Sequence, residues 1–310
     1  MLLVLGIGSV FGGRIGQTET LTLEQCIAIA LKSNPLILRS MQEHKATLAR
    51  IDQATAHPYP SVDFNSDLQP VPFDFVNSEE AYLGVSQTFE FPGKRELRGR
   101  IAEEESAQSR AELDVIRLDI VFGVKEAFLG LLLAQEKSSY VERDLELSRD
   151  FEAMAELKYS AGDVAKVEVL RAKLETVQAA NALRVAADAE RLAKARLNSV
   201  MALPQSTSVS IVGELKRPLL DLDVTKLRRE ALESRPELRR ISSEVERIHL
   251  RQEQTRLTKK PDFDVNLSYH YLRDLPASWS FAISVPLPFL FTHRQDAEIE
   301  ESQATLGALS

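Results

Sequence analysis

The stretch Pro261–Leu287, PDFDVNLSYHYLRDLPASWSFAISVPL, alternates between apolar and polar side chains. In residues 263–271 the odd positions are Phe, Val, Leu, Tyr and Tyr, and the even positions between them are Asp, Asn, Ser and His. Residues 278–287 alternate in the same way, with Trp279, Phe281 and Ile283 set against serine and alanine. A period of two is the period of a β-strand, so each run predicts a strand with one apolar and one polar face. Each run has about the 9–10 residues that a tilted strand needs to cross a bilayer.

The two runs are separated by Leu272–Ala277, which contains Arg273, Asp274 and Pro276 and is predicted to be a loop. Together they form one β-hairpin. A single hairpin of this kind favours a soluble domain in which the apolar face covers a core. A second copy of the hairpin elsewhere in the chain would favour membrane-spanning strands.

Residues 61–91 provide that second copy. Residues 62–68 and 81–91 both alternate, with valine, leucine and phenylalanine on one parity and mostly polar or small residues on the other. Pro35 and Asp63 in the first half of the chain are separated from Pro236 and Asp264 by the same interval. The order helix, proline break, helix, hairpin, helix therefore occurs twice, which is typical of an internal repeat.

The repeat divides the chain into four consecutive parts, namely a signal-like or disordered N-terminus (1–20), a first repeat (21–203), a linker (204–223) and a truncated second repeat (224–310). Three hairpins fall inside these parts, namely β-hairpin 61–91, a long helical hairpin 94–202 and β-hairpin 262–287. The short apolar run Leu2–Val10 resembles the central region of a secretory signal. Because Gln295–Leu309 starts another long helix that has no returning partner, we expect the chain to be a fragment that lacks the second helical hairpin.

The helical segments carry their own start and stop signals. Thr22 and Gln25 form a capping box ahead of an apolar run. Lys94–Ser160 contains no proline, and if it is continuous, its rise of 1.5 Å per residue gives a rod of roughly 100 Å. Gly162 suits the position after a helix, Asp163 suits the cap of the next helix, and a returning helix is predicted from Val164 to about residue 202. Such a hairpin alone would be compatible with a plain structural coiled coil.

Bulk composition excludes several functions. The chain has 310 residues, 44% of them hydrophobic, and a net charge of −8. Its densest basic run, Lys94–Arg100, is short and contains Glu96, so no nucleic-acid partner is predicted. Cys26 is the only cysteine and is predicted to be a buried small residue, which excludes an intrachain disulfide and a cysteine metal cage. The five histidines are scattered without HExxH spacing, so neither catalysis nor a bound metal or cofactor is predicted.

Four strands cannot close a membrane barrel, because known barrels have at least eight. An open sheet edge in lipid also leaves backbone groups unpaired, at a cost of several kcal/mol each. Several chains are therefore predicted to contribute strands to one barrel. The apolar side chains would face lipid, and the polar side chains would face a water-filled lumen. The predicted lumen-facing residues are Asp63, Asn65, Asp67, Ser86, Thr88, Asp264, Asn266, Ser268, Ser280 and Ser284.

Three segments resemble a known family. LTLEQCIAIALKSNP (21–35), AYLGVSQTFEFPGKR (81–95) and KYSAGDVAKVEVLRAKLE (158–175) are similar to the outer-membrane efflux proteins, the TolC-like family. VSQTFEFPGKR resembles its cation-efflux branch in particular. The resemblance covers about residues 21–310 and implies a mainly α protomer with four transmembrane β-strands, three copies of which form a twelve-stranded barrel over a helical tunnel.

The same resemblance implies a function and partners. The protein would be the outer-membrane component of a tripartite efflux system, a passive conduit from periplasm to exterior. A periplasmic adaptor and an inner-membrane pump would dock at the tips of the helical hairpins. Carried over by motif, Tyr159, Gly162, Asp163 and Val164 match the first-repeat tip, where adaptor docking and closure of the aperture are expected. The second tip is absent from this chain, and so is the N-terminal cysteine that often carries a lipid in the family.

Two alternatives have a different architecture. A periplasmic adaptor also contains a long helical hairpin, but adaptors surround it with soluble β-domains and lack two repeated hairpins of bilayer length. A soluble structural coiled coil would explain the helices without explaining the alternating strands. The repeated strands therefore favour the channel.

Overall fold

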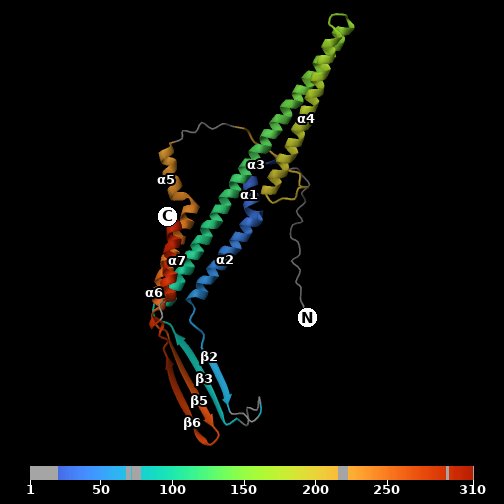
Figure 1. Ribbon diagram of the computed structural model, residues 1–310. Helices are drawn as coiled ribbons and strands as arrows, with labels where there is room; N and C mark the ends of the chain where they lie inside the picture. The colour runs from blue at the N-terminus through green and yellow to red at the C-terminus, as the bar shows by residue number, and fades with distance from the viewer. Residues whose placement is uncertain (1–19, 68–70, 72–77, 216–222, 291–292, 310) are drawn as a thin grey trace. The chain divides into compact units, whose positions relative to one another are not determined.

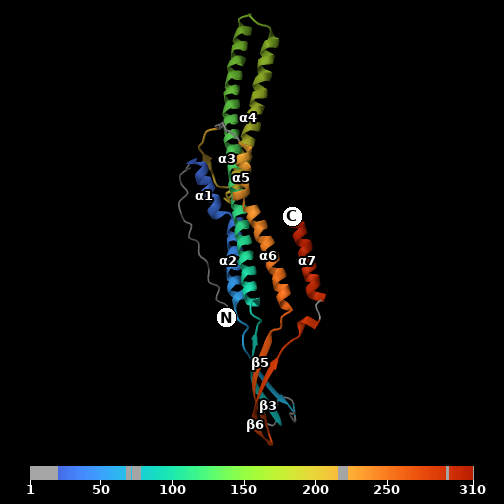
Figure 2. The ribbon, with the colours of Figure 1, turned by 90° about the vertical axis from the view of Figure 1, so that its left-hand side faces the viewer.

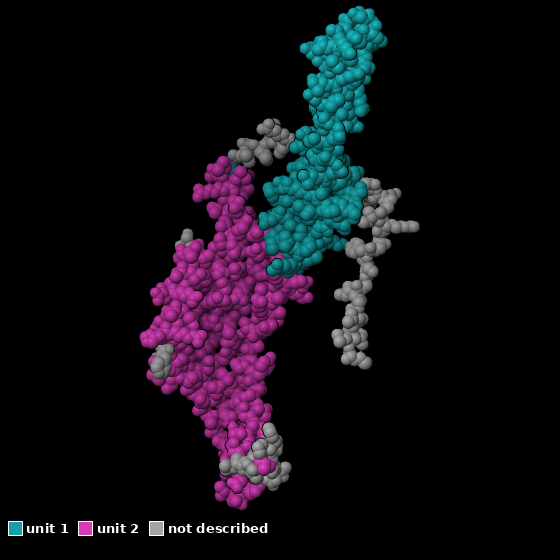
Figure 3. Space-filling view, turned by 45° about the vertical axis from the view of Figure 1, so that its right-hand side comes forward, with its two compact units in different colours: residues 1–39, 116–223 teal, residues 40–115, 224–310 magenta. Residues whose placement is uncertain are grey.

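The computed structural model describes residues 20–67, 71, 78–215, 223–290 and 293–309 (Figure 1). The predicted signal-like segment up to residue 19, most of the segment 69–80 between the first two predicted strands, and residues 216–222 of the predicted linker lie outside these residues. The chain divides into two compact units, unit 1 (residues 1–39 and 116–223) and unit 2 (residues 40–115 and 224–310), coloured separately in Figure 3. Unit 2 combines segments of both predicted repeats.

The order of helices and strands repeats as expected from the sequence. The first set consists of β1 (Thr20–Leu21), α1 (Leu23–Ser33), α2 (Pro35–Thr55), β2 (Ser61–Asp67), β3 (Glu80–Phe89), α3 (Lys94–Ser160) and α4 (Lys166–Val200). The second set consists of β4 (Ser210–Ile211), α5 (Val224–Ser234), α6 (Pro236–Thr258), β5 (Phe263–Leu272), β6 (Leu275–Ser284), the 3₁₀ turn Pro288–Leu290 and α7 (His293–Leu309). A short helix, a proline at the start of the next helix, a hairpin and a further helix thus occur twice.

Unit 1 has a small apolar core where α1 packs against α3 and α4. Its buried side chains include Cys26, Phe128, Leu131 and Leu197, and the parallel pair β1–β4 adds Ile211. Burial raises the pKa of the Cys26 thiol to about 11, which keeps it protonated and inert. The prediction that Cys26 is buried is confirmed.

The Asn–Pro break after α1 is fixed by hydrogen bonds. The Asn34 side chain, 5% exposed, donates from Nδ2 to the Val200 carbonyl (3.1 Å) and accepts at Oδ1 from the Leu36 amide (2.9 Å). Pro35 then starts α2 without needing an amide donor. A polar side chain that looks like a simple loop residue in the sequence therefore ties the first short helix to the end of α4.

The helical hairpin of unit 1 consists of α4 and the part of α3 beyond residue 115, which run side by side in Figures 1 and 2. Thr176 Oγ1 donates to the Ser148 carbonyl (3.2 Å), and Lys173 pairs with Glu156 (2.8 Å). The predicted helix 94–160 is confirmed over its whole length. The predicted cap at Asp163 is wrong, because α4 starts later and is capped by Ala165 without a side-chain hydrogen bond.

Unit 2 contains one antiparallel sheet in the order β2–β3–β5–β6, so the two hairpins are joined through β3 and β5. The loop predicted at Leu272–Ala277 is shorter in the structure, because Leu272 pairs with Leu275 and only Arg273 and Asp274 turn the chain. Pro276 consequently lies in β6, an edge strand of this sheet, where a missing amide donor is tolerated.

The helices of unit 2 meet through charged contacts. Arg251 and Arg240 of α6 pair with Glu105 (3.1 Å) and Glu112 (3.5 Å) of α3. Figure 2 shows α7 beside α6, to which Lys259 connects it through Asp296 (3.0 Å). Among the described residues, no helix has both the length and the apolar character that crossing a membrane requires.

The capping box of α1 makes a local prediction. Thr22 Oγ1 accepts from the Gln25 amide (3.4 Å) and Gln25 Oε1 accepts from the Thr22 amide (2.8 Å). Thr22→Ala should cost about 1 kcal/mol and speed amide exchange in the first turn of α1 about fivefold. Hydrogen exchange followed by mass spectrometry checks this, with α4 as the internal control. Unchanged exchange in α1 would contradict the assignment of the cap.

Candidate functional site: a two-faced sheet and a helical tip

Strand register brings the polar side chains of four strands to one face. Ser86 is paired with Asn266 and Thr88 with Asp264 across β3 and β5, while Ser268 is paired with Ser280 across β5 and β6. Directly paired residues point to the same side of a sheet. All ten polar strand residues that the sequence suggested lie on this polar face, namely Asp63, Asn65, Asp67, Ser86, Thr88, Asp264, Asn266, Ser268, Ser280 and Ser284.

Side chains on the polar face bond to one another across the strands. The Ser86 hydroxyl donates to Asp63 Oδ2 (2.9 Å) and Thr88 Oγ1 donates to Asp264 Oδ1 (2.5 Å), so each hydroxyl holds a carboxylate of the neighbouring strand. Tyr82 and His270 stack with ring centroids 5.4 Å apart. These contacts link β2, β3 and β5 into a connected polar surface.

Gly84 lies where the polar face is most crowded. A Cβ atom at this position would come within 3.2 Å of the Ser268 Cβ and 3.4 Å of the Asn266 side chain. Both Gly84 and Ser268 are buried within the sheet. Glycine therefore allows β3 and β5 to approach closely on this side.

The opposite face of the sheet is apolar and exposed. Its aromatic pairs include Phe89 stacked on Phe263 (5.3 Å) and Tyr269 edge-on to Trp279 (5.3 Å). Leu267 is 47% exposed and Trp279 is 71% exposed. Further large exposed side chains on this apolar face are Val62, Phe64, Leu83, Val85, Tyr271, Phe281 and Ile283. An apolar surface of this extent, all on one side of one sheet, is unusual for a protein face in contact with water.

Two polar side chains, Ser66 near the end of β2 and Gln87 near the end of β3, depart from this pattern. Gln87 has the parity of the apolar face but lies near the end of β3, where its Nε2 donates to the carbonyls of Pro58 (3.0 Å) and Thr88 (2.8 Å). Both amide protons are thereby used locally. The exceptions mark the edges of the apolar face.

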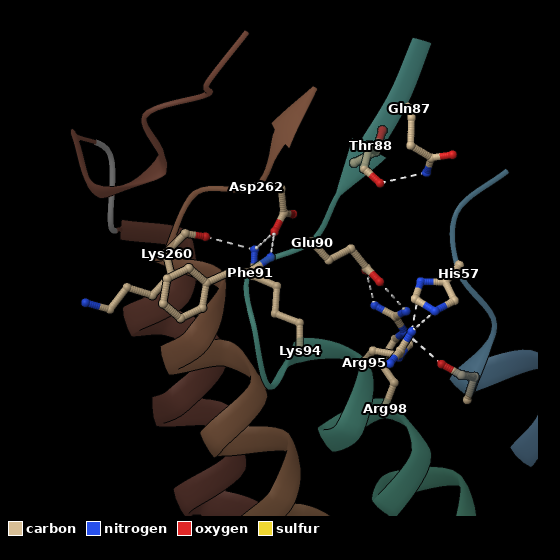
Figure 4. Close-up of polar contacts among 11 residues, drawn as sticks. His57, Gln87, Thr88, Glu90, Phe91, Lys94, Arg95, Arg98, Lys260 and Asp262 are labelled. Carbon is tan, nitrogen blue, oxygen red and sulfur yellow. Dashed lines mark hydrogen bonds and ion pairs between the residues drawn. The ribbon is translucent and has the colours of Figure 1, made fainter. Parts of the chain in front are cut away.

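Beyond the strands, ion pairs fix the turn from β3 into α3 (Figure 4). Glu90 makes a bidentate contact with Arg98, and Arg98 Nε also donates to the Ala54 carbonyl at the end of α2 (3.2 Å). Lys94 Nζ pairs with Asp262 (2.7 Å), and the same carboxylate accepts from the Phe91 amide (2.7 Å). These contacts join the start of α3 to both hairpins.

The chain reverses here at Gly93. Its φ of +94° lies in the left-handed region that favours glycine. The hydrogen bond to Arg98 holds the pKa of Glu90 below its usual value and raises the pKa of Arg98. The pair is therefore ionised at neutral pH.

The tip of the helical hairpin contains the four residues carried over by motif. Gly162 has φ +87°, and its amide donates to the Tyr159 carbonyl (3.0 Å) as α3 ends. Gly162 and Asp163 are exposed, Tyr159 is 45% exposed, and Val164 is half-buried. The structure thus brings the predicted tip residues together in one turn.

The ion pairs at the end of β3 were not predicted from the sequence. Glu90 and Arg98 are eight positions apart, while Lys94 and Asp262 are 168 positions apart. Alternation along a strand says nothing about such partners. The available signal was the charged segment EFPGKR directly after a strand, since charges there need partners once the chain folds back.

The family of the chain follows from its similarity to known proteins. The model of the outer membrane efflux protein family matches residues 26–203, more than half of the chain. The chain belongs to the outer membrane efflux protein family. Membership places it in the outer membrane, and the mainly helical fold with a small sheet is that of a TolC-like channel protomer.

Among proteins of this family, the chain is 25% identical to the cobalt-zinc-cadmium resistance protein CzcC of Cupriavidus metallidurans over 272 residues. The match covers 86% of this chain and 63% of CzcC, so the chain spans less than two-thirds of this relative.

Solved channels share the fold of these efflux proteins. The outer-membrane channel OprN is 18% identical with a TM-score of 0.74, over 93% of this chain and 68% of OprN. CusC is 14% identical with a TM-score of 0.71, over 93% and 70%. The MtrE channel of Neisseria gonorrhoeae is 17% identical with a TM-score of 0.69, over 93% and 68%.

The Glu90–Arg98 pair predicts a dependence of stability on pH. Because the folded pKa of Glu90 lies below its unfolded value, the pair stabilises the junction above the unfolded pKa and loses this effect as the pH falls through the folded pKa. Glu90→Gln should lower the thermal stability of this efflux protein at pH 7 and remove that acid-dependent part.

Melting temperatures measured between pH 3 and pH 7 test this, with Glu103→Gln, an exposed position on α3, as the control. Equal melting temperatures for Glu90→Gln and the unchanged protein at pH 7 would contradict a stabilising ion pair.

Proposed function

We propose that this chain is a protomer of the outer-membrane channel of a tripartite efflux system, a passive conduit from periplasm to exterior. The observation that carries this proposal is the sheet of unit 2, whose apolar face is exposed and whose polar face is internally hydrogen-bonded. A soluble sheet buries its apolar face against a core. Here that face suits the hydrocarbon of a bilayer, which leaves the polar face for a water-filled lumen.

The open edges of the sheet support assembly from several copies. The sheet ends in β2 on one side and β6 on the other, and within the described strands neither outer edge is paired. Unpaired backbone amides and carbonyls are costly in lipid, so neighbouring protomers would have to supply the missing strands. Three copies would provide twelve strands, which exceeds the minimum of eight for a closed barrel and keeps the number even.

The ten polar residues would then line the lumen, with Asp63 and Asp264 held in place by Ser86 and Thr88. Their side chains are polar and bind water well. Among the described residues, no group of three His, Cys, Asp or Glu side chains is placed to hold a metal ion. A water-lined passage without a binding centre supports a conduit rather than a catalyst.

The partners proposed here follow from the family and from the exposed tip. A periplasmic adaptor would bind at Tyr159, Gly162, Asp163 and Val164, and an inner-membrane pump would supply the energy and select the cargo. CzcC is by name a resistance protein for cobalt, zinc and cadmium, so these cations are the first cargo to test for export.

Assembly provides the direct test of the channel. The protein extracted from outer membranes should migrate as a heat-sensitive trimer, because only pooled strands satisfy the edges of β2 and β6. Purified trimer should conduct ions in a planar bilayer, and boiled monomer should not. Recovery as a soluble monomer that carries no conductance would overturn the proposal.

The face assignment has its own test. Leu267→Arg would place a charge at mid-depth in lipid and should hinder membrane assembly by about 2–4 kcal/mol. Asp264→Asn, on the polar face of the same strand, should have a far smaller effect because water remains in contact with the side chain. Quantifying heat-sensitive trimer in the outer-membrane fraction compares the two variants. A larger defect for Asp264→Asn would mean that the faces are assigned the wrong way round.

A further inference from the structure

A groove of about 1120 Å³ lies in unit 2 where β3 passes into α3. Three segments line it, namely Thr55, His57 and Pro58 before β2, residues 87–93 at the end of β3, and the pair Arg95–Glu96 on the first turn of α3. The groove therefore lies where the apolar strands end and the charged helices begin. Under the proposed function this is the level at which lipid headgroups meet the protein.

Arg95 differs from the other cations at this junction. Lys94 pairs with Asp262, Arg98 with Glu90 and Arg100 with Glu246. In the described part of the chain, the polar partner of the Arg95 side chain is instead the imidazole of His57 (Figure 4). The positive charge of Arg95 is thus not compensated by a carboxylate, and a phosphate could approach it together with the exposed His57.

Part of the groove wall is apolar and aromatic. Phe89 is 46% exposed and belongs to the apolar face, which continues from the groove along β3. Phe91, Pro58 and Pro92 add further apolar surface, and Tyr59 beside them is 90% exposed. Aromatic side chains of this kind are enriched at the boundary between hydrocarbon and headgroups. A free phosphate would use none of this surface, whereas an acyl chain would cover it.

The acidic groups of the groove indicate which kind of lipid headgroup it would bind. Of the two carboxylates that line the groove, Glu90 is neutralised by Arg98, and the exposed Glu96 has no ion pair with another described residue. A cation and an anion on adjacent residues match a headgroup that carries both charges. A primary ammonium would suit Glu96 best, because it donates hydrogen bonds that a quaternary ammonium cannot.

We propose that this groove binds a phospholipid with a phosphoethanolamine headgroup. The phosphate lies against Arg95 and His57, the ammonium against Glu96, and an acyl chain over Phe89 and the apolar face. The inference rests on the proposed function, since it needs the strands to lie in a membrane. The bound lipid would fill the junction between sheet and helices.

Native mass spectrometry of the purified, delipidated protein tests the site. The protein is titrated with phosphatidylethanolamine, phosphatidylglycerol or phosphatidylcholine in detergent, and in a separate arm with inorganic phosphate. We expect phosphatidylethanolamine to bind most tightly. Arg95→Gln should weaken its binding at least tenfold and Arg95→Lys much less, whereas Arg100→Gln, which removes the same charge from the same helix, should leave binding unchanged. Glu96→Gln should remove the preference for phosphatidylethanolamine over phosphatidylglycerol.

Equal binding by Arg95→Gln and the unchanged protein would overturn the proposal, and so would displacement of the lipid by inorganic phosphate alone. Trimer assembly and conductance are measured on the same samples and should be the same for Arg95→Gln as for the unchanged protein. A failed lipid titration with intact conductance would therefore reject the lipid site without affecting the channel.

Discussion

This structure depends on one constraint. The backbone amides and carbonyls at the edges of its sheet need hydrogen-bond partners, although the large side chains of one face are apolar. Water cannot solvate the face formed by Leu267, Phe281 and their neighbours at low cost, and lipid cannot pair the open edges of β2 and β6. One chain resolves neither problem. The proposed ring of identical chains in a bilayer would resolve both, because each edge would pair with a neighbouring chain and each apolar face would contact hydrocarbon.

The junction between sheet and helices follows from the same arrangement. The lipid-facing side of the strands must carry few charges, whereas the helices beyond them are rich in charge, so the proposed change of environment falls within a few residues around Gly93. Glu90, Lys94, Arg98 and Asp262 pair there and connect both hairpins to the start of α3. The ion pairs thus lie at the end of the strands, outside the paired region, where their charges do not have to enter hydrocarbon.

Much of this architecture could be predicted because its signals are periodic. The alternation in 263–271 fixed which side chains share a face, and the absence of proline from Lys94 to Ser160 predicted one long helix. Contacts set by tertiary packing could not be predicted. Asn34 bonds to Val200 and Lys94 to Asp262 across more than 160 positions, and the cap of α4 moved from Asp163 to Ala165 without any side-chain bond. Neither propensity nor spacing contains that information.

Cysteine accessibility along β5 tests the central claim most directly. Cys26 is buried and protonated, so single cysteines can be introduced in turn at Asp264, Val265, Asn266 and Leu267 without a background signal. In the assembled protein in membranes, a water-soluble maleimide should label positions 264 and 266 and leave 265 and 267 unlabelled. Labelling of 265 and 267 in preference to 264 and 266, or equal labelling of all four, would contradict a sheet with lipid on its apolar face and water on its polar one.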